Sequence, residues 1–125
     1  MYNCQEEVTG MPNVVEEKSK DFAVRAVKLY KYLCKEKQEY VISKQVLRSG
    51  TSIGANIAEA QEGQSKKVFI SKMSIALSEA RETMYWLELL VRTEYITKLQ
   101  YESINEDCRE LIKLLTVIIK KSRSE

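Results

Sequence analysis

The sequence predicts an all-α protein, an antiparallel up-down-up-down four-helix bundle. Apolar residues recur at intervals of three and four along most of the 125-residue chain, and only four glycines and one proline interrupt them. Sandwiches, barrels and repeated βα units need more turn residues than that. The length allows one domain with one hydrophobic core. We divide the chain into a flexible leader at 1–13, the bundle at 14–122 and a tail at 123–125.

The first helix is expected to begin near Asn13, which can cap it with Glu16 as its capping-box partner, or one turn later. It is expected to end near Lys37, where a polar link follows. Its apolar side chains share one narrow face, which comprises Phe22, Ala26, Leu29 and Leu33.

The second helix is expected to begin at Ser43 as N-cap, because Ile42 and Leu47 have the spacing of a hydrophobic staple around it. It is expected to run to about Glu62. Gly63 follows at the position where a left-handed residue commonly ends a helix.

The third helix is expected from Lys66 to Thr93 with Ser65 as its cap, and its apolar face is broad enough to contact two neighbours. The fourth helix begins either at the capping box of Thr97 and Gln100 or at a similar pair, Ser103 and Glu106, further along. Because the connections are short, successive helices are expected to be antiparallel. The fourth helix carries a heptad-like seam of Ile104, Cys108, Leu111, Leu115 and Ile118.

Small residues recur every fourth position in the second helix, at Gly50, Gly54 and Ala58. Each glycine inside a helix costs about 0.5–1 kcal/mol relative to alanine, so another interaction must offset that cost. We interpret this face as the site of close packing against a neighbouring helix rather than as a ligand crevice.

The composition limits the chemistry that the chain can perform. It contains no histidine, which excludes imidazole-based triads and dyads and histidine-containing metal sites. Its cysteines, Cys4, Cys34 and Cys108, are odd in number and widely spaced, which favours reduced thiols over a disulfide framework. No segment has the pattern of a signal peptide or a membrane span. We expect a cytoplasmic, non-catalytic protein that has no cofactor, no metal site and no membrane partner.

A second face of the second helix is wholly polar. Serine and asparagine are mediocre helix formers, so a face selected for solvation alone would more often carry Lys, Glu or Gln. On the third helix an arc beside the main apolar stripe includes a tryptophan, for which the alternative is packing on the first or fourth helix. We predict a subunit or partner interface that comprises Arg48, Ser52, Asn56, Glu59, Ile75, Glu79 and Trp86.

The segment 48–60, RSGTSIGANIAEA, and the segment 66–80, KKVFISKMSIALSEA, resemble a bacterial four-helix bundle family. This is the family of proteins encoded in the intervening sequences of 23S ribosomal RNA genes, and the resemblance covers nearly the whole chain. Ala60 stands where the family frequently has glycine. The residues that match the family's motif S-I-x-x-N-I-A-E-G are Ser52, Ile53, Asn56, Ile57, Ala58 and Glu59, and Phe69, Ser78 and Glu79 also resemble its third helix.

The resemblance implies a homo-oligomer, usually a pentameric ring, and offers no catalytic residues to transfer. It also implies a class of partner. A relative, the accessory protein of diversity-generating retroelements, binds a reverse transcriptase and nucleic acid through a strongly basic surface.

The formal net charge of +2 does not by itself indicate a nucleic-acid binder, so such a role needs a local patch. One candidate patch lies opposite the apolar stripe of the first helix, and further cations occur at 66–67 and 120–123. An oligomer could gather them on one surface and repeat the phosphate contacts by symmetry, whereas the alternative is solubility alone. The predicted contacts are Arg25, Lys28, Lys31, Lys35, Lys66, Lys67, Lys120, Lys121 and Arg123.

We therefore expect a non-catalytic homo-oligomer that binds RNA, DNA or a nucleic-acid-processing enzyme. One alternative is a purely structural oligomer. Another is a small enzyme with a carboxylate–metal site, in which Glu59 and Glu79 would meet inside the bundle. A helical ribonuclease of the toxin type fits poorly, because it relies on a histidine.

Overall fold

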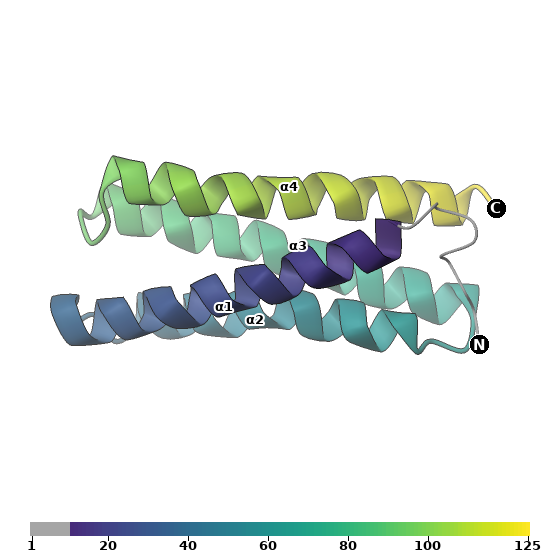
Figure 1. Ribbon diagram of the computed structural model, residues 1–125, viewed down its shortest axis with the longest axis horizontal. Helices are drawn as coiled ribbons and strands as arrows, with labels where there is room; N and C mark the ends of the chain where they lie inside the picture. The colour runs from purple at the N-terminus through teal and green to yellow at the C-terminus, as the bar shows by residue number, and fades with distance from the viewer. Residues whose placement is uncertain (1–10) are drawn as a thin grey trace.

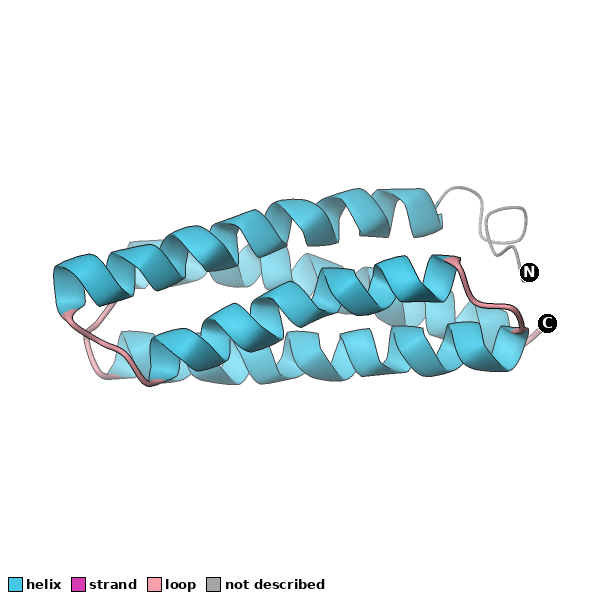
Figure 2. Ribbon diagram, turned by 90° about the horizontal axis from the view of Figure 1, so that it is seen from below, coloured by secondary structure: helices cyan, strands magenta, loops and turns pink. Residues whose placement is uncertain are grey.

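The computed structural model describes residues 11–125, which form four α-helices and contain no strand (Figure 2). The helices are α1 (Met11–Lys37), α2 (Ile42–Gln61), α3 (Lys66–Arg92) and α4 (Lys98–Arg123). Each helix packs on its neighbours in the chain, and α1 also packs on α4. The colours of Figure 1 show α1 and α3 running toward the left end of the molecule and α2 and α4 toward the right end. The predicted all-α class with four helices is confirmed.

The observed helix boundaries lie close to the expected ones, with differences at both ends of the chain. Helix α1 begins at Met11, so 11–13 belong to the helix rather than to the leader that the sequence predicts. The rest of that leader, 1–10, lies outside the described residues. At the other end, α4 continues to Arg123 and extends by one residue into the predicted tail.

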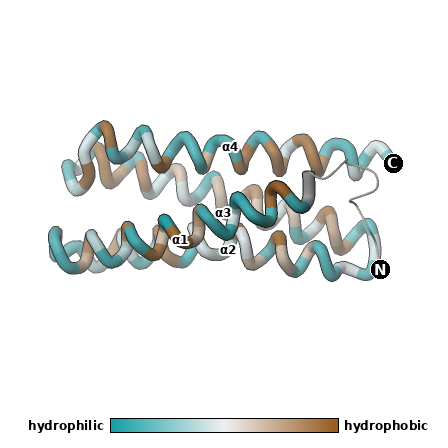
Figure 3. Tube along the Cα trace, in the orientation of Figure 1, coloured by the Kyte–Doolittle hydropathy of each residue, from teal (hydrophilic) through white to brown (hydrophobic). Residues whose placement is uncertain are grey.

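The core lies along the axis of the bundle and receives side chains from all four helices. Hydrophobic residues recur along every helix between hydrophilic ones (Figure 3), as the sequence periodicity predicts. Within the predicted stripe of α1, Leu29 is only partly buried, whereas the other members are buried. Burial of one large apolar side chain stabilises a fold by about 1.5–3 kcal/mol. The largest fully buried side chains are Phe22, Leu33, Ile53, Ile57, Phe69, Met73, Leu87, Leu90, Leu111, Leu115 and Ile118.

The glycine face of α2 packs directly on α1. A Cβ atom added at Gly50 would lie 2.7 Å from the Cβ of Ala26, and one at Gly54 would lie 3.3 Å from the Oγ of Ser19. The two backbones can therefore approach closely only because these positions lack side chains. This contact confirms the packing interpretation at Gly50 and Gly54 and explains what offsets their low helix propensity, whereas Ala58, the third small residue of the predicted face, is exposed.

Two of the predicted helix caps are confirmed. The side chain of Ser65 accepts a hydrogen bond from the backbone N–H of Val68 at 3.1 Å. Thr97 and Gln100 form the complete capping box at the start of α4. The alternative start at Ser103 is wrong, because that residue lies inside the helix.

The predicted cap of α2 is wrong, because α2 begins at Ile42 and Ser43 lies buried in its first turn. The carboxylate of Glu39 accepts hydrogen bonds from the backbone N–H groups of Val41 (3.2 Å), Ile42 (3.0 Å) and Ser43 (2.7 Å). Burial of the Glu39 carboxyl opposes ionisation, but these hydrogen bonds outweigh it and lower its pKa. The Glu39 carboxylate therefore caps α2, in place of the Ser43 side chain that the sequence predicts.

The end of α2 also differs from the prediction. Gly63 does not have a positive φ, and a Cβ there would lie 3.0 Å from the carbonyl oxygen of Ala60. Close approach to this carbonyl, rather than a left-handed backbone, therefore favours glycine at this position. The left-handed residues after helices are Gln38 (φ 50°) and Glu94 (φ 66°), which follow α1 and α3.

Candidate interface and nucleic-acid surface

The predicted interface residues of α2 and α3 meet on one outer face of the bundle. The guanidinium of Arg48 contacts the carboxylate of Glu79, with Nη1 and Oε2 at 3.1 Å, and also the carboxylate of Glu82. The indole Nε1–H of Trp86 donates to Glu82 Oε2 at 2.9 Å. A cation on α2, two carboxylates and an indole on α3 therefore form one continuous network.

The other predicted interface residues of α2, Ser52, Asn56 and Glu59, each have a hydrogen-bond or ion-pair partner. Ser52 Oγ donates to the carbonyl oxygen of Arg48 at 2.7 Å, and Asn56 Nδ2 donates to the carbonyl oxygen of Ser52 at 2.9 Å. Glu59 forms an ion pair with Lys72 of α3, with Nζ and Oε1 at 2.8 Å. Sequence reasoning missed Lys72 and Glu82, because the partner of a charge on another helix depends on how the two helices are aligned.

Apolar side chains lie beside this network. Ile75 is 44% exposed and Tyr85 is 58% exposed. Trp86 is partly buried and packs against the core cluster, with its ring edge-to-face against that of Tyr85 at 5.1 Å between centroids. Exposed apolar side chains therefore lie next to ion pairs on this face.

The predicted cations of α1 lie in its C-terminal half, which runs toward the left end of the molecule in Figure 1. Arg25 is bound to α4: its Nη1 lies 2.7 Å from Asp107 Oδ2, and its Nη2 donates to Ser103 Oγ at 3.0 Å. Among the described residues, no ion pair involves Lys28, Lys31 or Lys35, which are exposed. Of the predicted cations of α1, these three lysines therefore have no acidic partner within the part of the chain that is described, whereas Arg25 has one.

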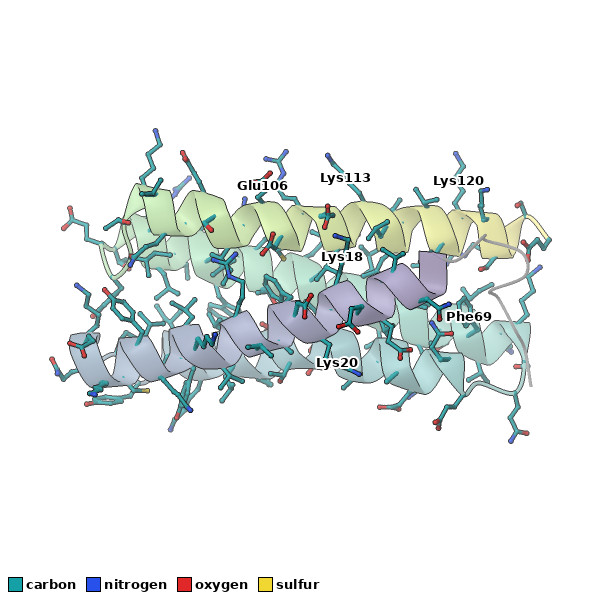
Figure 4. The ribbon with its side chains drawn as sticks, in the orientation of Figure 1. Lys18, Lys20, Phe69, Glu106, Lys113 and Lys120 are labelled. Atoms are coloured by element: carbon teal, nitrogen blue, oxygen red, sulfur yellow. The ribbon has the colours of Figure 1, made fainter. Side chains whose placement is uncertain are left out.

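A second group of cations lies at the opposite end, where α3 begins and α4 ends (Figure 1). We call it the terminal cationic cluster. The side chain of Lys120 points away from the bundle (Figure 4). Between residues 11 and 125, no ion pair involves any member of this cluster. The members are Lys66, Lys67, Lys120, Lys121 and Arg123. Within one subunit, the predicted nucleic-acid contacts thus fall into two separate groups.

The two carboxylates considered for a metal site do not meet inside the bundle. Glu59 pairs with Lys72 and Glu79 pairs with Arg48, in both cases on the outer α2/α3 face. Across 11–125, no cluster of three or more acidic or cysteine side chains is arranged to hold a metal ion. The alternative of a carboxylate–metal site at Glu59 and Glu79 therefore has no geometric support.

The described cysteines are free thiols, and Cys4 lies outside the described residues. Burial raises the pKa of Cys108 to about 12, and its Sγ donates to the carbonyl oxygen of Ala80 at 3.2 Å. At neutral pH this thiol is protonated and serves as a core residue. No helix in the described part of the chain is both long and apolar enough to cross a membrane.

Comparisons with known proteins agree with this architecture. The crystal structure of a protein of unknown function from the S23 ribosomal protein family of Bacteroides thetaiotaomicron VPI-5482 is similar, with a TM-score of 0.87 and 64% sequence identity. The similarity covers 88% of this chain and 98% of that chain. No protein with a curated description matches the chain. The family model for the 23S rRNA-intervening sequence protein matches residues 12–117. The chain therefore belongs to the 23S rRNA-intervening sequence protein family.

Proposed function

We propose that this protein is a non-catalytic, cytoplasmic homo-oligomer that binds nucleic acid, with the up-down-up-down bundle as its subunit. The observation that carries the proposal is the terminal cationic cluster, whose cations come from two helices and have no acidic partner in the described structure. Cations that are not already paired within the protein are available to neutralise phosphates and release counterions.

In a symmetric oligomer, a cluster of a few cations per subunit is sufficient to bind nucleic acid. The formal net charge of one chain is only +2, so a single subunit has little long-range attraction for nucleic acid. A closed oligomer repeats the cluster at each subunit, and a structured RNA or DNA can contact several copies at once. We propose a ring, with a pentamer as the ring size implied by the family resemblance.

The α2/α3 face is the proposed subunit interface. Arg48 and Glu79 are already paired within one chain, so less side-chain freedom would be lost when a second subunit binds. Ile75, beside them, would lose exposed apolar surface on assembly. Asn56 and Glu59 extend the same face along α2.

The absence of catalysis is also a proposal, supported by the side chains themselves. The sequence has no histidine. The carboxylates that could have acted together, Glu59 and Glu79, are bound to cations. Cys108 has a raised pKa, which disfavours its thiolate nucleophile.

Gel retardation of a structured RNA tests the nucleic-acid proposal. We expect the parent protein to retard the RNA at low salt and to release it as the salt concentration rises. A variant with Lys66→Gln, Lys67→Gln, Lys120→Gln and Lys121→Gln should bind at least tenfold more weakly.

The matched control replaces two exposed lysines at the other end of the bundle, Lys44→Gln and Lys98→Gln, and should bind within about twofold of the parent. Two results would contradict the proposal: no retardation by the parent protein at low salt, or equal binding by the cluster variant. An oligomer that retards no nucleic acid would instead support the purely structural alternative.

Light scattering, with circular dichroism beside it, tests the interface. The double variant Asn56→Ala and Glu59→Ala should lower the measured mass while the helical signal stays unchanged. Lys113→Ala, on the outer surface of α4 (Figure 4), is the control and should keep the parent mass. A monomeric parent protein, or an unchanged mass for the double variant, would refute this interface.

A further inference from the structure

An apolar groove of about 450 Å³ lies between α1 and α4. It is lined by Leu29 and Tyr32 of α1, by Ile96 of the α3–α4 connection and by Leu99 of α4, with Arg25 and Lys28 also in its lining. Leu99 is 79% exposed, the highest exposure among the large hydrophobic residues that the structure describes. The groove therefore offers substantial apolar surface to solvent.

The groove exists because α1 and α4 separate toward the end of the bundle where α1 ends and α4 begins. Figure 1 shows the two helices close together on the right and apart on the left. Arg25 bridges them through Asp107 and Ser103. Beyond this bridge the side chains of α1 and α4 leave the side of the bundle open, as the groove shows.

The charged residues that line the groove are cationic, and one of them, Arg25, is already paired with Asp107. Lys28 also lies in its lining, and no acidic side chain among residues 11–125 lines it. On the same outer surface of α1, Lys31 and Lys35 continue the line of positive charge toward the end of the helix, where they are exposed. The ligand that complements this arrangement carries apolar groups toward the groove floor and negative charge toward α1.

We propose that the groove binds an amphipathic, acidic α-helix of a protein partner. A third helix laid between two diverging helices places apolar side chains at i, i+3 or i+4, and i+7 into the groove. Its glutamates or aspartates then face Lys28, Lys31 and Lys35. The mostly aliphatic lining favours a protein helix over nucleic acid, which would use the lysines but leave the accessible surface of Leu29 and Leu99 uncovered.

This binding site is separate from the proposed nucleic-acid surface. The terminal cationic cluster lies at the other end of the bundle, so helix binding and nucleic-acid binding need not compete (Figure 1). The two proposals can therefore fail independently.

Fluorescence anisotropy tests the proposal with a labelled synthetic helical peptide of about 15 residues, with leucine at i, i+3, i+4 and i+7 and glutamate on its other face. We expect the intact protein to bind this peptide at least tenfold more tightly than a matched peptide with lysine in place of glutamate. Leu99→Glu and the triple variant Lys28→Glu, Lys31→Glu and Lys35→Glu should each weaken binding at least tenfold.

Val117→Glu is the matched control, because Val117 is an exposed apolar residue on the same helix outside the groove. It should bind the acidic peptide like the parent. Absence of binding, equal binding of both peptides, or parent-like binding by Leu99→Glu would overturn the proposal. A fall in oligomer mass for Leu99→Glu would assign the groove to a second copy of the chain. A tenfold loss of RNA binding for the same variant would assign the groove to nucleic acid. Either result would also overturn the proposal.

Discussion

Helix α1 contacts two neighbours in different ways. Against α2 it packs so closely that Gly50 has no room for a Cβ, which would lie 2.7 Å from Ala26. Against α4 it is bridged at the surface by ion pairs, Lys18 with Glu110 at 2.8 Å and Arg25 with Asp107 at 2.7 Å, and beyond them the apolar groove opens.

The α1/α2 contact contributes mainly to stability, whereas the α1/α4 side contains the proposed binding groove. The α1/α2 contact at Gly50 depends on close fit between the two backbones, so it should dominate the energy that holds α1 in place. The α1/α4 ion pairs are exposed to solvent, and exposed pairs contribute about 0–1 kcal/mol. Because α2 holds α1 in place, the groove on the α4 side can bind a partner without loss of the fold.

The largest effect is expected from Gly54→Leu, which places a large side chain against the backbone of Ser19. Overpacking should lower the free energy of unfolding by about 3 kcal/mol, as measured by urea denaturation. Ala55→Leu, at the exposed neighbouring position, is the control and should change it by less than about 0.5 kcal/mol. Equal stability of the two variants would show that this seam is not tightly packed.

Gly50→Ala should lower the free energy of unfolding by about 1–2 kcal/mol. The sign is informative, because alanine normally stabilises a helix relative to glycine by about 0.5–1 kcal/mol. The added Cβ would collide with that of Ala26, so Ala26→Gly in the same chain should restore part of the loss. Stabilisation by Gly50→Ala alone would show that α1 and α2 do not approach closely at Gly50.

Glu39→Ala should lower the free energy of unfolding by about 1 kcal/mol at pH 7, because the first N–H groups of α2 lose their acceptor. The pKa of Glu39 is lowered in the folded state from an ordinary value of 4.5, so its ionised form stabilises the fold above that pH. This contribution is lost as the pH falls through the lowered pKa. Urea denaturation of parent and Glu39→Gln at several pH values should show curves that converge in acid, and a constant gap would contradict the role of the charge.

Asp107→Asn should have the smallest effect, below about 1 kcal/mol, and the effect should shrink further at high salt. The carboxylate of Asp107 is half exposed in its pair with Arg25. Thermal unfolding at low and high salt measures it. A loss comparable to that of Gly54→Leu would mean that α4, not α2, holds α1.

Several features of the fold follow directly from the sequence. Apolar periodicity predicts the buried seam of α4, and the short polar motifs at Ser65 and Thr97 predict where α3 and α4 begin. The spacing of Gly50 and Gly54 predicts the close helix contact. Each of these signals is local, because the residues that produce it lie within one or two helical turns of each other.

The features that were missed depend on how segments meet. Glu39 caps α2 from outside the helix, so the usual pattern around Ser43 is misleading. The pairing of Arg48 with Glu82 depends on the alignment of α2 and α3. The groove beside Leu99 depends on the divergence of α1 and α4, which no local pattern encodes.

The separation of the predicted cations into two groups could have been derived from the topology. If successive helices are antiparallel, the end of the first helix and the start of the third lie at opposite ends of the bundle. Lys35 and Lys66 therefore cannot be neighbours within one subunit. The members of the candidate interface on α2 share one face already in the sequence pattern, and their role as an interface stays a prediction.

The most direct test of the contrast between the two sides of α1 is a nuclear Overhauser measurement on the folded protein. The close α1/α2 contact predicts a strong cross-peak between the Hα protons of Gly50 and the methyl protons of Ala26. The absence of that cross-peak, in a spectrum where both resonances are assigned, would contradict the account.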